Sequence, residues 1–180
     1  LNVMPLFHIH GLVAAVSASL AAGAQICCAP GFNALRFFAQ LKAVEPTWYT
    51  AVPTMHQAIL TRAGRNREII ENANLRFLRS SSASLPAPVM QALAVTFKAP
   101  VIEAYGMTEA THQMCCNPLP PRGQKPGSVG LAAGPEVRIA DETEDRLLGP
   151  GATGEIVISG ANVTPGYEGN PSANNSAFFM

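Results

Sequence analysis

The chain contains 180 residues, with 12 basic and 12 acidic side chains, so its formal charge at neutral pH is zero. Charged residues make up 13% of the sequence, about half of the usual fraction in globular domains, while 48% of the residues are hydrophobic. This balance excludes a nucleic-acid-binding surface, which needs clustered Lys and Arg, and intrinsic disorder, which needs low hydrophobicity and high net charge. Because both ends of the chain are apolar, we expect an internal piece of a larger protein.

The longest apolar run covers residues 11–24 and includes two serines. Crossing a bilayer takes about 20 residues, so this run predicts a buried helix and no membrane span. The cysteines form two adjacent pairs, Cys27-Cys28 and Cys115-Cys116, which have neither zinc-site spacing nor the geometry of an unstrained disulfide. We therefore expect reduced, buried thiols and a cytoplasmic protein without a signal peptide. A peroxisomal location would require a signal at the C-terminus of the parent protein.

Helical and extended patterns alternate over the first ~110 residues. An Ala- and Leu-rich segment at 12–22 predicts a helix that ends at Gly23, followed by a short strand at 25–29. Further helices are expected at 33–45, 53–63 and 86–98, and further strands at 47–52, 75–79 and 100–104. Strands that alternate with helices predict parallel βαβ units, so the fold class is α/β.

The pattern changes after Thr111. Prolines and glycines crowd into residues 118–134, which predicts a loop, and short antiparallel strands are expected at 137–139, 155–158 and 160–167. We therefore divide the chain into an α/β part over residues 1–112 and a loop with the start of a β-barrel-like part over residues 113–180.

Three clusters of reactive side chains follow predicted strands or apolar segments, where ligands bind in open α/β sheets. They are His8–Gly11, Ser80–Ser84 and Tyr105–His112. Each has an ordinary alternative, since serines after a strand often only cap the next helix. His8 and His10 could also share a metal as in a metallohydrolase, although no supporting Asp or His set lies nearby in the sequence.

The third cluster contains Tyr105-Gly106-Met107-Thr108-Glu109, which resembles the signature of the adenylate-forming superfamily. This superfamily comprises acyl-CoA synthetases, luciferases and the adenylation domains of peptide synthetases. Three further strings, at 5–8, 79–86 and 154–167, are similar to its other motifs and occur in the same order. Four motifs in order across nearly the whole chain imply the central part of the superfamily's large N-terminal domain.

The resemblance implies that ATP and a carboxylic acid form an acyl-adenylate, from which CoA then displaces AMP. It gives catalytic roles to His8, Thr108 and Glu109, with Glu109 as a ligand of Mg²⁺ and Thr108 as a donor to the α-phosphate. Tyr105 offers a flat face for adenine. The implied nucleotide-binding residues are Ser82, Ala83, Ser84, Glu103, Ala104, Tyr105, Gly106, Met107 and Thr108. Ala104 departs from the Gly that the superfamily commonly has there.

Residues 48–57, 79–85 and 103–112 are similar to the oxalate–CoA ligase branch, the peroxisomal CoA-synthetase-like proteins. This resemblance implies an acyl pocket lined by Ser82 and His112, with His8 near the reacting carboxylate and His10 as a further donor. Lys125 is a more distant candidate. A small carboxylic acid such as oxalate is the expected substrate. The alternatives are an aryl or medium-chain acid, and a nucleotide-binding remnant that has lost catalysis.

The superfamily places its phosphate-binding loop before the segment matched by Leu1. It places its ribose-binding Asp, its hinge and its C-terminal lid domain after the segment matched by Met180. We therefore expect an AMP-forming acid–thiol ligase in the parent protein, and no activity from these 180 residues alone.

Overall fold

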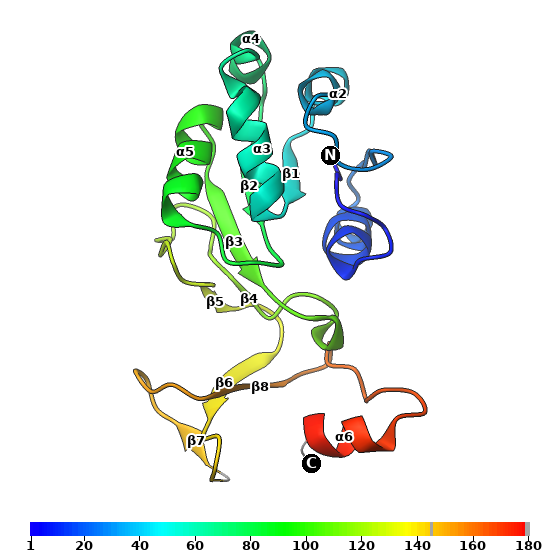
Figure 1. Cartoon of the computed structure of the whole chain (residues 1–180), viewed down its shortest axis with the longest axis vertical. Coiled ribbons are helices and arrows are strands. Elements are labelled where there is room, and N and C mark those ends of the chain that lie inside the picture. Colours follow the sequence, from blue (N-terminus) through cyan, green and yellow to red (C-terminus); the bar gives the residue numbers. More distant parts are fainter. Residues whose placement is uncertain (145, 179–180) are drawn as a thin grey trace.

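The computed structural model describes residues 1–144 and 146–178, which form a mixed α/β fold with two sheets (Figure 1). In the larger sheet three parallel strands are followed by two antiparallel ones. Their order is β1 (Trp48–Ala51), β2 (Phe77–Ser80), β3 (Val101–Tyr105), β4 (Cys115–Cys116) and β5 (Leu131–Ala132). The predicted parallel βαβ arrangement is therefore confirmed, and β4 and β5 extend the same sheet beyond residue 112.

Two long helices connect the parallel strands and pack against each other (Figure 1). They are α3 (Pro53–Ala63) and α5 (Ala87–Phe97). α3 begins at Pro53 and α5 directly follows Pro86, and the fixed φ of proline suits the start of a helix. The shorter helices α2 (Phe37–Val44) and α4 (Arg67–Glu71) complete this side of the molecule. The core between helices and sheet includes the fully buried Tyr49, Leu78 and Leu93, so apolar packing fixes where the parallel strands end.

The apolar segment near the N-terminus is helical, as predicted, but the prediction that it is buried is wrong, because Leu12 and Leu20 are 48% and 59% exposed. It forms a π-helix, η1 (His10–Ser17), that continues into α1 (Ala18–Ala21). The expected helix end at Gly23 is displaced only slightly: α1 ends at Ala21, and Gly23, with a φ of 69°, lets the chain turn away. The helix begins two residues earlier than expected and therefore includes His10.

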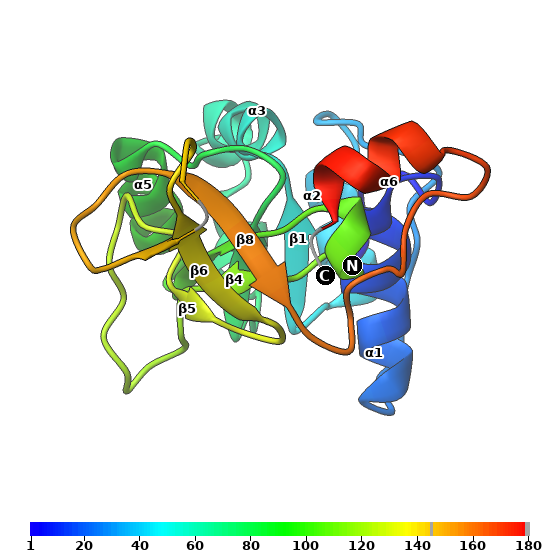
Figure 2. The same cartoon turned by 90° about the horizontal axis from the view of Figure 1, so that it is seen from below.

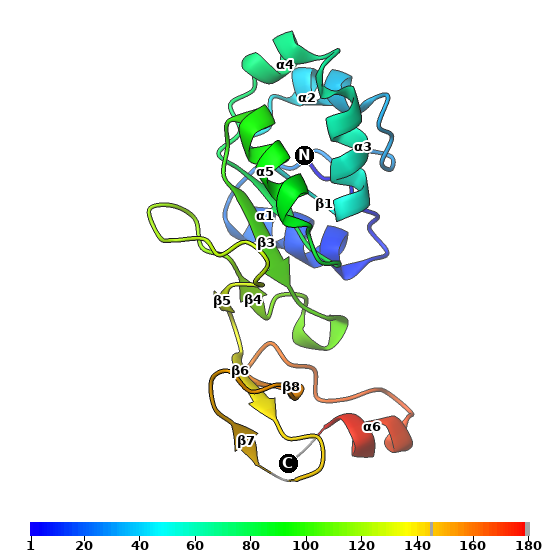
Figure 3. The same cartoon turned by 60° about the vertical axis from the view of Figure 1, so that its left-hand side comes forward.

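The second sheet is small and antiparallel, with the order β7 (Leu147–Leu148), β6 (Glu136–Ala140) and β8 (Glu155–Ser159). It lies at the far end of the molecule, apart from the layer formed by α3 and α5 (Figure 3). Seen from below, β6 and β8 lie in front of the larger sheet, and α6 (Pro171–Ala177) is on the side of the N-terminal helices (Figure 2). Asn162 joins the two parts, because its amide donates to the carbonyl of Ala110 at 2.7 Å.

Two predicted strands are wrong. Residues 25–29 make only a single bridge, between Asn2 and Cys28, because Pro30 and Gly31 turn the chain away directly afterwards. Residues 160–167 form turns, since Gly160 and Gly166 lack the side chains that would pack on a sheet.

None of the helices within residues 1–144 and 146–178 is long and apolar enough to cross a membrane. The four cysteines are free thiols, as the adjacent pairs predict, but the expected burial holds only for Cys115, since Cys28 is exposed and the other two are half-buried.

Candidate active site

A cavity of about 300 Å³ opens where β2 and β3 end, which is large enough for part of a small-molecule ligand. Parallel strands place their carboxyl ends at one edge of a sheet, so the loop after β2 and the end of β3 meet there. The lining includes seven residues that the sequence assigns to nucleotide binding: Ser82, Ala83, Ser84, Glu103, Ala104, Tyr105 and Gly106. The structure therefore brings together residues that lie some 20 positions apart in the chain.

Main-chain hydrogen bonds hold this cavity in shape. The carbonyl of Ala104 accepts from the Ser81 hydroxyl at 2.8 Å, and that of Tyr105 accepts from the amide of Met114 at 2.9 Å. The buried carboxylate of Glu103 accepts a hydrogen bond from the amide of Leu85 at 2.8 Å. This bond fixes the end of the segment Ser80–Ser84, which we call the serine loop. Gly106 packs against the main chain of His112, where a Cβ atom would overlap the carbonyl oxygen.

One wall of the cavity was not expected from the sequence. Gly127, Ser128 and Val129 come from the loop before β5 and line the cavity together with Ser82–Ser84. Asn117 holds this loop, since its amide group donates to the carbonyl of Ser128 at 2.5 Å and accepts from the amide of Lys125. The glycines of this loop could have predicted its position beside the cavity, because glycine permits close approach of a backbone to a ligand.

A second group of polar side chains, which we call the histidine cluster, consists of His10, Ser82, His112 and Arg79. His10 Nδ1 lies 3.0 Å from the Ser82 hydroxyl, and the rings of His10 and His112 lie 5.3 Å apart. Three of the four predicted acyl-pocket residues therefore meet. His8, the fourth, is exposed, and its Nδ1 accepts the amide of His10 at 3.1 Å.

The histidines of the cluster are uncharged at neutral pH. Burial, reinforced by the nearby charge of Arg79, lowers the pKa of His10 to about 3 and that of His112 to about 4. His10 Nε2 also lies 2.5 Å from the Thr50 hydroxyl, so both of its ring nitrogens have protein partners. This pairing occupies both ring nitrogens of His10, one of the two histidines that a metallohydrolase site would need, and within the described ranges no three metal-ligating side chains gather.

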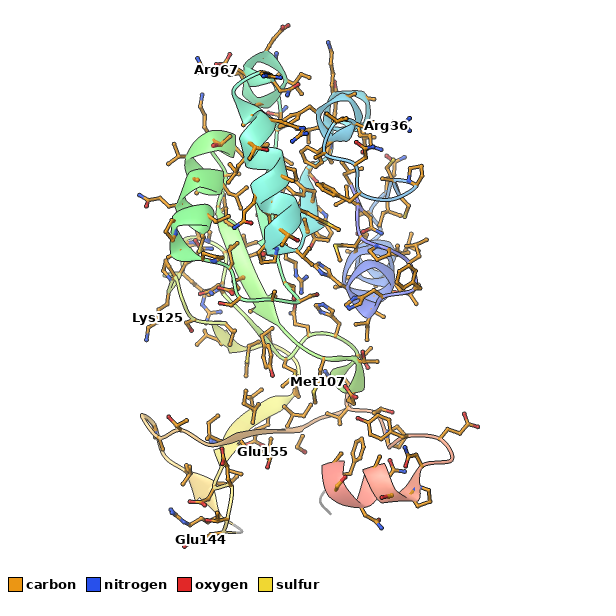
Figure 4. The ribbon with its side chains drawn as sticks, in the orientation of Figure 1. Arg36, Arg67, Met107, Lys125, Glu144 and Glu155 are labelled. Atoms are coloured by element: carbon orange, nitrogen blue, oxygen red, sulfur yellow. The ribbon has the colours of Figure 1, made fainter. Side chains whose placement is uncertain are left out.

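Thr108 and Glu109 lie in the short helix η2 (Thr108–Ala110), at the junction between the two sheets. In Figure 4, Met107 lies on the side of the larger sheet and Glu155 of β8 lies on the side of the smaller sheet. Glu109 and Met107 line a second cavity, of about 580 Å³, together with β8 and Tyr167. Met107, Thr108 and Glu109 therefore do not line the first cavity.

The Glu109 carboxylate is half-buried, and its Oε1 accepts a hydrogen bond of 2.5 Å from the Tyr167 hydroxyl. Its other oxygen has no recorded partner among the described residues. A hard carboxylate oxygen beside the exposed hydroxyl of Thr108 fits Mg²⁺, which proteins hold through one or two carboxylates and substrate phosphates. Lys125, by contrast, is exposed in the loop before β5, where its side chain points outward (Figure 4). Among the described residues, its recorded hydrogen bonds join its main chain to Asn117 and Ser128 and do not reach the histidine cluster.

Burial of three histidines makes the stability of the protein sensitive to acid. The folded-state pKa values of His10, His56 and His112 are about 3, 4 and 4, below the unfolded value of about 6.5. The unfolded chain therefore binds protons first, and stability that is present above pH 6.5 is lost as the pH falls toward 4. We expect the free energy of unfolding to drop by about 2 kcal/mol for each fully buried ring between pH 7 and pH 5, and by about 4–5 kcal/mol for the three together.

Urea unfolding at pH 7, 6 and 5 measures this drop. The variant His8→Asn should keep the full pH dependence, because His8 is exposed. A free energy of unfolding that stays constant from pH 7 to pH 5 would contradict the predicted burial of the three neutral rings.

Comparison with known proteins agrees with this geometry. Residues 1–168 match the family described as AMP-binding enzyme. An oxalate–CoA ligase of Arabidopsis thaliana is 49% identical over 179 residues, 98% of this chain and 34% of the relative. The oxalate–CoA ligase of Saccharomyces cerevisiae is 40% identical over 176 residues, 98% of this chain and 32% of the relative. The crystal structure of ATP-bound MatB from Rhodopseudomonas palustris superposes with a TM-score of 0.87 at 28% identity, covering 99% of this chain and 35% of that one.

The chain spans about a third of the length of these relatives. The family match includes all four motifs, both cavities in large part and the whole histidine cluster. The shared fold extends across both sheets. The expectation of an adenylate-forming fold is confirmed, and the chain belongs to the AMP-binding enzyme family.

Proposed function

We propose that this chain is the central part of the nucleotide- and acid-binding domain of an AMP-forming acid–CoA ligase, with oxalate or another small carboxylic acid as substrate. One observation carries the proposal: Ser82 lines the first cavity and also contacts His10 of the histidine cluster. A nucleotide in the cavity would therefore lie next to an acid at the cluster. The names of the relatives, two of them oxalate–CoA ligases, support the choice of acid.

In the proposed reaction, a carboxylate oxygen of the acid bonds to the α-phosphorus of ATP, while the bond to pyrophosphate breaks. Tyr105 packs on the adenine, the serine loop lies against the opposite side, and the Thr108 hydroxyl donates to the α-phosphate. Glu109 would hold Mg²⁺, which neutralises charge on the phosphates when bound. His8 orients the reacting carboxylate. The thiol of CoA then attacks the acyl carbon, and AMP leaves.

The histidine cluster favours a small polar acid over the aryl or medium-chain alternative. Its members are hydroxyl, imidazole and guanidinium groups, and a hydrocarbon substrate would leave the buried Nη1 of Arg79 without a partner. Oxalate keeps a second negative charge after one carboxylate has reacted, and such a charge needs buried donors.

Pyrophosphate exchange into ATP tests the proposal. The protein that carries this chain, produced from its full reading frame, is assayed with oxalate, benzoate and octanoate. We expect exchange that depends on oxalate, and none from the 180 residues alone. Exchange driven by benzoate or octanoate would favour the alternative acids, and binding of ATP without exchange with any acid would favour the nucleotide-binding remnant.

The acyl-pocket roles of Ser82 and His112 can be tested separately. Replacing both by Ala in the full-length protein is expected to raise the KM for oxalate at least about tenfold, because two donors to the acid are lost. The matched control is Ser17→Ala, which removes an exposed hydroxyl on the N-terminal helix. Steady-state kinetics at saturating ATP and CoA give the value, and an unchanged KM would remove both residues from the acid site.

A further inference from the structure

Arg79 is a buried cation that the sequence did not single out. It lies near the end of β2, in register with Thr50 of β1 and Ile102 of β3, and its exposed fraction is 5%. Nη2 donates to Gln113 Oε1 at 3.2 Å and lies 3.4 Å from His112 Nδ1. Nη1 is buried without a hydrogen-bond partner among the described residues.

No carboxylate neutralises this guanidinium in the part of the chain that the structure describes. The ion pairs found there join Arg138 and Arg146 to acids of the β6–β7 region, far from β2. The buried carboxylate of Glu103 is used by the amide of Leu85. Cys116 lies close enough to interact with Arg79, but burial raises the pKa of its thiol, so it carries no negative charge at neutral pH.

A buried guanidinium without a counter-ion is costly, because its charge has lost the hydration that it had in the unfolded chain. Burial lowers the pKa of Arg79 only to about 10, so the group stays charged at neutral pH. The neighbouring His10 and His112 are neutral. The cluster therefore has one net positive charge and one buried guanidinium nitrogen without a hydrogen-bond partner among the described residues, and this is the chemistry that an anion would complement.

The contact with His112 also settles which nitrogen of that ring accepts. Arg79 can only donate, so Nδ1 of His112 is the acceptor and the proton of the neutral ring lies on Nε2. Nε2 has no recorded partner among the described residues. Arg79 thus orients a second donor in the cluster besides its own Nη1.

We propose that Arg79 is the counter-ion for the second negative group of the acid substrate, and that it restricts the acid site to small dianions. This inference rests on the proposed function, since the acid must bind at the histidine cluster. Oxalate fits because its unreacted carboxylate stays ionised throughout adenylation and thioester formation. The chemistry selects any short acid with a second anionic group, and it disfavours monocarboxylates, which would leave the guanidinium buried and unpaired.

A comparison of two substrates in the wild-type, full-length protein tests this without any variant. Oxamate has the size of oxalate, but a neutral amide replaces one carboxylate. We expect kcat/KM for oxalate to exceed that for oxamate at least about 30-fold, the effect of leaving a buried charge unpaired. Equal values for the two acids would overturn the proposal.

Variants then assign the effect to Arg79. Arg79→Gln should lower kcat/KM for oxalate at least about 30-fold, bring the oxalate-to-oxamate ratio close to one, and leave the KM for ATP unchanged. Arg79→Lys keeps a charge and should retain part of the preference. The matched control Arg76→Gln removes an exposed guanidinium three residues earlier and should change nothing.

The outcomes separate this inference from the function on which it rests. Absence of pyrophosphate exchange with every acid would overturn the proposed function. If Arg79→Gln still catalyses exchange with oxalate and still prefers oxalate to oxamate, only the role of Arg79 would be overturned. If Arg79→Gln does not fold, as judged by circular dichroism, Arg79→Lys and the wild-type substrate ratio decide.

Discussion

Replacing Glu109 by Gln in the full-length protein is expected to lower the rate of adenylate formation about 1000-fold, the largest loss we predict. A carboxylate is a hard anionic ligand, whereas the amide keeps the shape but loses the charge that Mg²⁺ requires. The Gln oxygen can still accept from the Tyr167 hydroxyl, so the junction between the two sheets should stay folded. Single-turnover measurement of acyl-adenylate gives the rate, and a Mg²⁺ titration should shift to higher concentrations.

The matched control is Glu155→Gln, since Glu155 is exposed on β8 and lines the same cavity. Its rate and Mg²⁺ dependence should equal those of the wild type. If Glu109→Gln loses less than about tenfold, or if both variants behave alike, Glu109 does not hold the metal and the proposed catalytic role falls. Tyr167→Phe should give an intermediate effect, because it removes the hydroxyl that orients the carboxylate.

The first cavity, which we propose holds the nucleotide, was largely predictable because most of its residues lie in two continuous strand-to-loop segments. Such segments carry their geometry with them: Ser82–Ser84 follow β2, Glu103–Gly106 close β3, and parallel pairing of the two strands then brings them together. The helices that begin at or directly after a proline were predictable for the same local reason. Where the backbone conformation is determined within one short segment, the amino-acid pattern of that segment is sufficient to predict the structure.

Residues placed by long-range packing could not be predicted in this way. Arg79 lies in the short strand β2, and nothing in the local sequence shows that its guanidinium is buried against His112 and Gln113. The loop at Gly127–Val129 reaches the cavity only because Asn117 holds it. The pairing of Tyr167 with Glu109 spans 58 positions. In each case the contact depends on how separate elements meet, which periodicity and motifs do not record.

Local rules also failed where glycines permit an alternative conformation. Residues 160–167 contain apolar side chains typical of a strand, but Gly166 has a φ of 140° and the following turn is held by Asn174, whose side chain accepts the amide of Tyr167 at 2.7 Å. The resulting turns bring Tyr167 back to η2. The failed strand therefore positions the residue that contacts the proposed metal ligand.

The substitution Gly106→Ala should disturb both the first cavity and the histidine cluster. A Cβ atom at Gly106 would overlap the carbonyl oxygen of His112, and neither group is a flexible side chain that can move aside. The main chain at His112 must shift, which displaces its ring from Arg79 and opens the cavity beside Tyr105. We expect the free energy of unfolding to fall by about 3 kcal/mol and adenylate formation to fall at least about 100-fold, since small displacements of binding groups carry costs of this size.

Gly64→Ala is the matched control, because Gly64 is exposed at the end of α3 with φ near −59° and no atom within 4 Å of an added Cβ. There the same methyl group should be neutral or stabilise the protein by about 0.5 kcal/mol, because it restricts only the unfolded chain. Urea unfolding and single-turnover adenylation of the two variants separate a general cost of losing glycine from a specific clash. If Gly106→Ala matched Gly64→Ala in both measurements, Gly106 would not lie as close to His112 as the structure shows. The coupling of the first cavity to the histidine cluster would then also be wrong.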